Sequence, residues 1–200
     1  MKNETSALTR SSDKALRKVI LTVLLLNLAY FFIEFAVAQY IGSVSLFADS
    51  IDFLEDASIN FLILIALGWS LKGRARVGQF LALVLFVPVS ALLWTAWQKF
   101  HSPLAPEPWF LSITGMGALI INAFCALLLS KYRHHSGSLT RAAFLSARND
   151  VMANIAIILA GVITLYWRSG WPDLIVGLAI ACMNIDAAKE IWEAASKEKL

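Results

Sequence analysis

Residues 44–71 read VSLFADSIDFLEDASINFLILIALGWSL, an apolar run that contains no proline but carries four carboxylates in its first half. A helix needs roughly 20 predominantly apolar residues to cross a hydrocarbon core of about 30 Å, and this run is long enough. Placing an ionised carboxylate inside a bilayer costs free energy, so each of them is expected to have a partner, to be protonated or to serve a function. The segment therefore predicts a membrane helix with functional acids. These acids are Asp49, Asp52, Glu55 and Asp56.

The rest of the 200-residue chain has the composition of a membrane protein. It is 58% hydrophobic and only 16% charged, with a mean hydropathy of +0.67, which is too apolar for a soluble domain of this size. Charged or Pro/Gly-containing breaks divide it into six apolar stretches. The stretches are 15–41, 44–71, 77–100, 109–131, 139–167 and 171–195. We expect an all-α, six-helix transmembrane bundle at 15–195, with an N-terminal arm at 1–14 and a tail at 196–200.

The basic residues predict the orientation of this bundle. Fourteen of the 17 Lys and Arg residues fall in the N-terminal arm, the second and fourth loops and the C-terminal part, all on one side. Short loops rich in Lys and Arg stay cytoplasmic, so both termini are expected there, in a multi-pass protein of the bacterial inner membrane. Because these charges are distributed as topology and lipid-headgroup determinants, nucleic-acid binding is not expected.

The acids of the 44–71 segment follow helical spacing. Intervals of three and four put Asp49, Asp52 and Asp56 on one helical face. Like charges one turn apart repel each other, and far more strongly in a low dielectric than in water. Protons or a metal cation must therefore neutralise the stripe.

A second polar face lies in the 139–167 segment, where Ser146, Asp150 and Asn154 recur at intervals of four. At 1.5 Å per residue, Asp150 lies roughly 16 Å from the cytoplasmic start of its helix, a depth comparable with that of Asp56. Carboxylates on two facing helices, with a hydroxyl, make an oxygen-rich pocket suited to a divalent cation. The candidate ligands are Asp52, Asp56, Ser146 and Asp150.

A purely structural interpretation stays open for several of the polar residues. The acids could pair with Arg148, or hydrogen-bond across helices as isolated intramembrane polar residues often do. This interpretation remains for Asn27 and Asn122, and for Glu34 beside a role as a secondary relay. It is weaker for the candidate ligands, because one Arg148 cannot neutralise three or more acids. For Asp49 and Asp173 we expect a role in helix packing or in the exit path.

Three stretches of this sequence resemble the cation diffusion facilitators, also called cation efflux proteins, from about residue 16 to residue 192. They are Asn27 through Glu34 followed by Gly42-Ser43, Ser45-Leu46, Ala48-Asp49-Ser50 and Asp52-x-x-x-Asp56; Ser146-x-x-x-Asp150-Val151; and Trp171-x-Asp173. The resemblance implies a transport site in which Asp52 and Asp56 take the positions of the family's first pair and Asp150 that of the Asp of its second. It also implies export of Zn²⁺, Mn²⁺, Co²⁺, Fe²⁺ or Cd²⁺ in exchange for protons.

The sequence departs from the family pattern in two places. Many members have His where this chain has Ser146, and imidazole helps to select Zn²⁺, so the site here is harder and all-oxygen. The metal is therefore left open. The sequence also ends where the family's cytosolic C-terminal domain would begin, which implies a short form without that domain and leaves a homodimer open.

The resulting hypothesis is a metal/proton antiporter that exports its cation by alternating access. A channel is one alternative, although channels usually show polar stripes on several helices or a filter-like loop. A non-transporting membrane scaffold or accessory subunit, whose acids pair with a partner's basic residues, is another. No HExxH or GxSxG motif is present, so no enzymatic activity, catalytic residue or fixed cofactor is expected.

Overall fold

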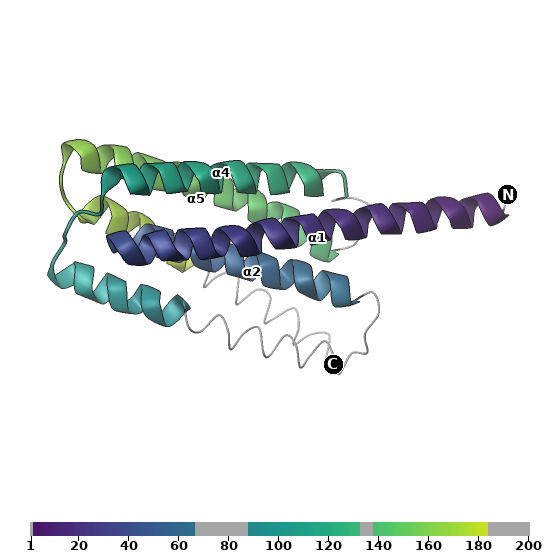
Figure 1. Ribbon diagram of the computed structural model, residues 1–200, viewed down its shortest axis with the longest axis horizontal. Coiled ribbons are helices and arrows are strands. Elements are labelled where there is room, and N and C mark those ends of the chain that lie inside the picture. The colour runs from purple at the N-terminus through teal and green to yellow at the C-terminus, as the bar shows by residue number, and fades with distance from the viewer. Residues whose placement is uncertain (1, 67–87, 133–137, 184–200) are drawn as a thin grey trace.

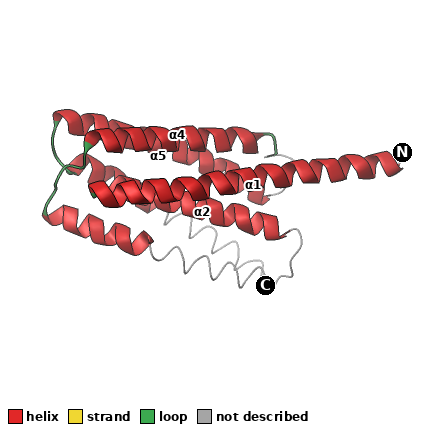
Figure 2. Ribbon diagram, viewed as in Figure 1, coloured by secondary structure: helices red, strands yellow, loops and turns green. Residues whose placement is uncertain are grey.

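The computed structural model describes residues 2–66, 88–132 and 138–183, and all of its regular structure there is helical (Figure 2). The helices are α1 (Lys2–Ile41), α2 (Val44–Ala66), a helix at 88–101, α4 (Pro108–Ser130), α5 (Ser138–Tyr166) and helix Trp171–Met183. The expected all-α, six-helix bundle is confirmed. The parts of the predicted segments at 67–87 and 184–195, and the predicted tail at 196–200, lie outside the described residues.

Helix α1 is longer than the predicted first span. It contains 40 residues and projects beyond its neighbours at the N-terminal end (Figure 1). No Gly or Pro occurs before Gly42, so nothing in the sequence ends the helix where the charged arm gives way to the apolar part. The arm at 1–14 is thus distinguished by composition, while the helix runs through it.

Three helices of the described part are long and apolar enough to cross a membrane: Lys14–Ile41, Pro108–Ser130 and Ala143–Tyr166. Their outward faces carry large apolar side chains, such as Leu127, which is 68% exposed, and Leu25, which is 55% exposed. Such a surface is what lipid requires. This protein is an integral membrane protein.

Two apolar clusters lie at different levels of the bundle. One contains Phe47, Leu111, Ile157 and Leu174 among its buried residues. We call it the loop-end cluster, because it lies near the α1–α2 turn. The second contains the following buried residues: Ile20, Val23, Ile63, Cys125, Leu129, Ala143 and Ala147. We call it the far-end cluster.

Between these two clusters the helices carry buried polar side chains. On α1 they extend from Asn27 to Glu34, and on α2 from Asp49 to Asp56. Asn122 of α4 and Asn154 of α5 are also fully or almost fully buried. A polar layer inside the bundle with apolar packing above and below it is the reverse of a soluble core. It is the arrangement expected of a pathway for ions.

Asp173 fixes the start of α2. Its carboxylate accepts hydrogen bonds from the Val44 amide at 2.9 Å and the Ser45 amide at 3.1 Å, and from the hydroxyls of Ser43 and Ser45 at 2.6 Å each. It also pairs with Lys99 Nζ at 2.7 Å, and both side chains are buried. The carboxylate therefore satisfies amide groups that the first turn of α2 leaves without helical partners. We call this group the Asp173 clasp.

Two glycines allow the close approach of backbones around the Asp173 clasp. Gly42 takes a positive φ of 64°, which gives the tight turn between α1 and α2. Gly177 lies against the start of α2, where an added Cβ would be only 2.6 Å from the Val44 carbonyl carbon. The loops also meet here, since the Gly170 amide donates to the Pro103 carbonyl at 2.9 Å. One end of the bundle is thus tied together across several helices.

Candidate metal site

Asp56 of α2 and Ser146 of α5 lie in direct contact. The Ser146 hydroxyl donates to Asp56 Oδ1 at 2.8 Å, and Asn27 of α1 donates to Asp56 Oδ2 at 3.5 Å. Asp56 is only 3% exposed. The predicted polar faces of α2 and α5 therefore meet at this hydrogen bond.

Asp52 and Asp150 complete the set of predicted ligands. Both are buried, at 7% and 8% exposure, on α2 and α5 respectively. Asp52 lies one turn from Asp56 on α2, and Asp150 lies one turn from Ser146 on α5, so both belong to the faces that meet at the Ser146–Asp56 hydrogen bond. Repulsion among buried carboxylates on two such faces favours a cation or protons.

The carboxylates do not converge on a point that already has metal-ligand geometry. Within residues 2–66, 88–132 and 138–183, no group of three or more His, Cys, Asp and Glu side chains is arranged to hold a metal ion. The Ser146–Asp56 hydrogen bond uses one of the oxygens that a cation would need. Binding would require the side chains to rearrange between α2 and α5, which are in contact.

Arg148 does not neutralise this group. It is exposed, as is Asn149 beside it, and it forms no ion pair with any acid in the described part of the chain. The interpretation in which these acids pair with Arg148 therefore finds no support. Asn154 is the buried amide of this helix.

The neighbouring amides form hydrogen bonds across helices, as the structural interpretation of isolated intramembrane polar groups expects. Asn154 donates to Asp49 Oδ2 and accepts from Asn122 Nδ2 at 3.1 Å. Asn27 donates to Asp56. Asn154 therefore already has hydrogen-bond partners, one helical turn from the proposed ligand Asp150. Its spacing from Asp150 could be read from the sequence, but its partners on α2 and α4 could not.

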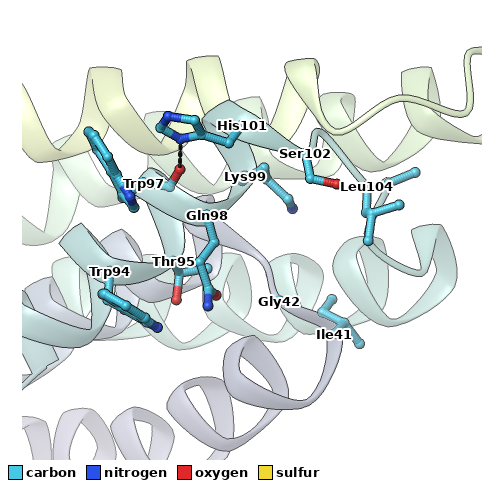
Figure 3. Close-up of a pocket in the computed structure, with 11 residues that line it drawn as sticks. Ile41, Gly42, Trp94, Thr95, Trp97, Gln98, Lys99, His101, Ser102 and Leu104 are labelled. Carbon is cyan, nitrogen blue, oxygen red and sulfur yellow. Dashed lines mark hydrogen bonds between the residues drawn. The ribbon is translucent and has the colours of Figure 1, made fainter.

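A cavity of about 600 Å³ lies elsewhere, at the loop end of the bundle (Figure 3). Trp94, Trp97, Lys99 and His101 are among its lining residues, together with Gly42. His101 Nδ1 lies 2.9 Å from the Trp97 carbonyl oxygen. No carboxylate of the polar layer lines this cavity, so it borders the Asp173 clasp through Lys99 and is separate from the acid site.

Comparison with known proteins identifies relatives over most of the chain. A sequence model of the family described as "Cation efflux transmembrane domain" matches residues 20–197. The chain is 25% identical over 173 residues to "Zinc transporter ZitB" of Yersinia pestis, covering 80% of this chain and 55% of the relative. It is 30% identical over 158 residues to "Cation-efflux pump FieF" of Salmonella typhi, covering 70% and 51%. The chain thus spans about half the length of the curated relatives that it matches.

Proposed function

Because this chain belongs to the cation efflux family, we propose that it exports a divalent metal cation from the cytoplasm, across a bacterial inner membrane, in exchange for protons. The observation that carries the proposal is the buried group formed by Asp52, Asp56 and Asp150 on two adjacent helices. All three acids are buried, and Asp56 accepts hydrogen bonds from the Ser146 hydroxyl and the Asn27 amide. The cation is the substrate, held in transit by these acids and the Ser146 hydroxyl.

The two apolar clusters support an alternating-access mechanism. A binding site inside a membrane must exclude water from one side at a time, and packed apolar side chains can provide that barrier. In the proposed cycle the far-end cluster separates to admit the metal from the cytoplasm, and the ligands lose protons to bind it. The loop-end cluster and the Asp173 clasp then open on the other side, where protons displace the metal.

The ligand set defines a class of substrate. Carboxylates and a hydroxyl are hard oxygen donors, which suit Mn²⁺ as well as the borderline ions Zn²⁺, Co²⁺ and Fe²⁺, and suit the soft ion Cd²⁺ least. The affinity order of divalent ions still favours Zn²⁺ over Mn²⁺ at such a site. The relatives named as zinc transporters support a divalent metal without deciding among these ions.

Metal-driven proton flux in proteoliposomes tests the function. Purified protein is reconstituted with a pH-sensitive dye inside the vesicles, and each of the five ions is added outside. We expect saturable proton flux with at least one of them. Conductance that rises without saturation would instead indicate a channel, and a folded protein that gives no flux with any ion would favour the accessory-subunit alternative.

Introducing an imidazole at residue 146 should change the metal preference. Ser146→His would place nitrogen beside Asp56, and nitrogen ligands favour Zn²⁺ over Mn²⁺. We expect the ratio of Zn²⁺ to Mn²⁺ affinity to rise by about tenfold, measured by calorimetry. Ser146→Ala is the matched control that removes the hydroxyl without adding nitrogen. An unchanged ratio in the histidine variant would show that residue 146 does not contact the metal.

A further inference from the structure

A second pair of acidic residues lies in the polar layer and is not part of the proposed set of metal ligands. Glu34 of α1 and Asp49 of α2 are both completely buried. Three of their oxygens receive no hydrogen bond from any donor in the described residues: both carboxyl oxygens of Glu34 and Oδ1 of Asp49. The remaining oxygen of Asp49 accepts from Asn154 Nδ2 of α5. A buried carboxylate without donors is costly, so this pair requires an explanation.

The two carboxyl groups lie on α1 and α2, which pack against each other. With both ionised, there would be two buried negative charges on neighbouring helices, with no donor among the described residues for three of their four oxygens. One proton changes this, because a protonated carboxyl donates to the other and satisfies both groups at once. Carboxyl pairs that share a site in this way take up and release their protons jointly.

The charges around the pair do not replace this proton. Tyr30 on α1, Asp52 and Asp56 on α2, and Asp150 on α5 are neutral or negative groups that act on it or lie in the same layer. From α4 the facing group is a neutral amide, Asn122, which bonds Asn154.

The nearby basic side chains of the described residues do not reach the pair. Lys99, from the 88–101 helix, pairs with Asp173 at the loop end, and Arg148 is exposed. Among the described residues, no cationic side chain pairs with Glu34 or Asp49.

We propose that Glu34 and Asp49 form a proton-binding site that is separate from the metal ligands and carries one of the counter-transported protons. The inference rests on the proposed antiport. Asp49 lies one helical turn, or roughly 4.5 Å along the axis, from Asp52. A divalent cation arriving at Asp52 repels a proton at that distance, so metal binding releases the proton from the pair and metal release allows it to return.

The first test counts protons released on metal binding in detergent. Calorimetry in buffers of different ionisation enthalpy gives this number directly. Glu34→Gln and Asp49→Asn each keep a donor for the remaining carboxylate, so the fold should be preserved. We expect both variants to bind metal and to release one proton fewer per metal than the wild type. Glu107→Gln, an exposed acid in the loop before α4, is the matched control and should release the wild-type number. Unchanged proton release in both variants would overturn the inference.

Infrared spectroscopy gives a second readout that needs neither transport nor metal. The wild type at neutral pH should show the C=O stretch of a protonated buried carboxyl group, shifted in D₂O, and this band should weaken in both variants. A wild type without the band, or variants that retain it in full, would contradict the shared proton. If the wild type shows the band but no metal-driven proton flux, the antiport proposal fails while the proton site stands.

Discussion

Asp150→Ala is expected to abolish saturable metal transport and to lower metal affinity by about 100-fold or more. Asp150 is 8% exposed and supplies the only carboxylate of α5 in the proposed site. Its loss leaves Asp52 and Asp56 on a single helix, without the charge that would join α5 to the cation. Changes in residues that merely support metal ligands already cost 10–100-fold, so loss of a ligand should cost at least as much. The measurements are flux in proteoliposomes and calorimetric binding in detergent.

Arg148→Ala is the matched control for this experiment. Arg148 lies two residues away on the same helix and is also charged, but it is exposed. We expect it to transport metal at a rate close to that of the wild type. Equal losses in the two variants, or wild-type affinity in Asp150→Ala, would remove α5 from the site. Asp52→Ala should resemble Asp150→Ala, because its carboxylate belongs to the same group.

The spacing of polar residues predicts which face of each helix contributes to the proposed site. Asp52 and Asp56 share one face of α2, and Ser146 and Asp150 share one face of α5. Residues one turn apart on a helix stay on one face in any tertiary structure, so the sequence carries this information directly. The Ser146–Asp56 hydrogen bond shows that the two faces meet. The six apolar stretches predicted the helices for the same reason, since the bilayer sets their length.

Contacts between particular side chains of different helices could not be predicted in this way. Glu34 and Asp49 lie on different helices, and no spacing rule relates two separate helices. Asp173 and Lys99 were also far apart in the sequence, and each looked like a polar residue near a helix end. Their pairing depends on how closely the helices approach, which Gly177 permits where it contacts Val44.

The Asp173 clasp should be the most sensitive point for stability. Asp173→Ala leaves Lys99 buried, at 6% exposure, without the carboxylate that pairs with it, and removes the acceptor for the Val44 and Ser45 amides. Removing one partner of a buried ion pair typically costs about 3–5 kcal/mol. We therefore expect a marked fall in the temperature at which the protein unfolds in detergent, followed by circular dichroism.

Lys99→Met should cost less than Asp173→Ala, because the remaining carboxylate keeps its donors from Ser43, Val44 and Ser45. The double variant Asp173→Ala/Lys99→Met should be more stable than Asp173→Ala alone, since it removes the uncompensated ammonium group. Arg168→Ala, an exposed basic residue in the neighbouring loop, is the control and should unfold like the wild type. If Asp173→Ala and Lys99→Met lowered the unfolding temperature equally and the double variant added their effects, the two side chains would be energetically independent. The start of α2 would then be held by the hydrogen bonds of Asp173 with Ser43, Val44 and Ser45, without a contribution from Lys99.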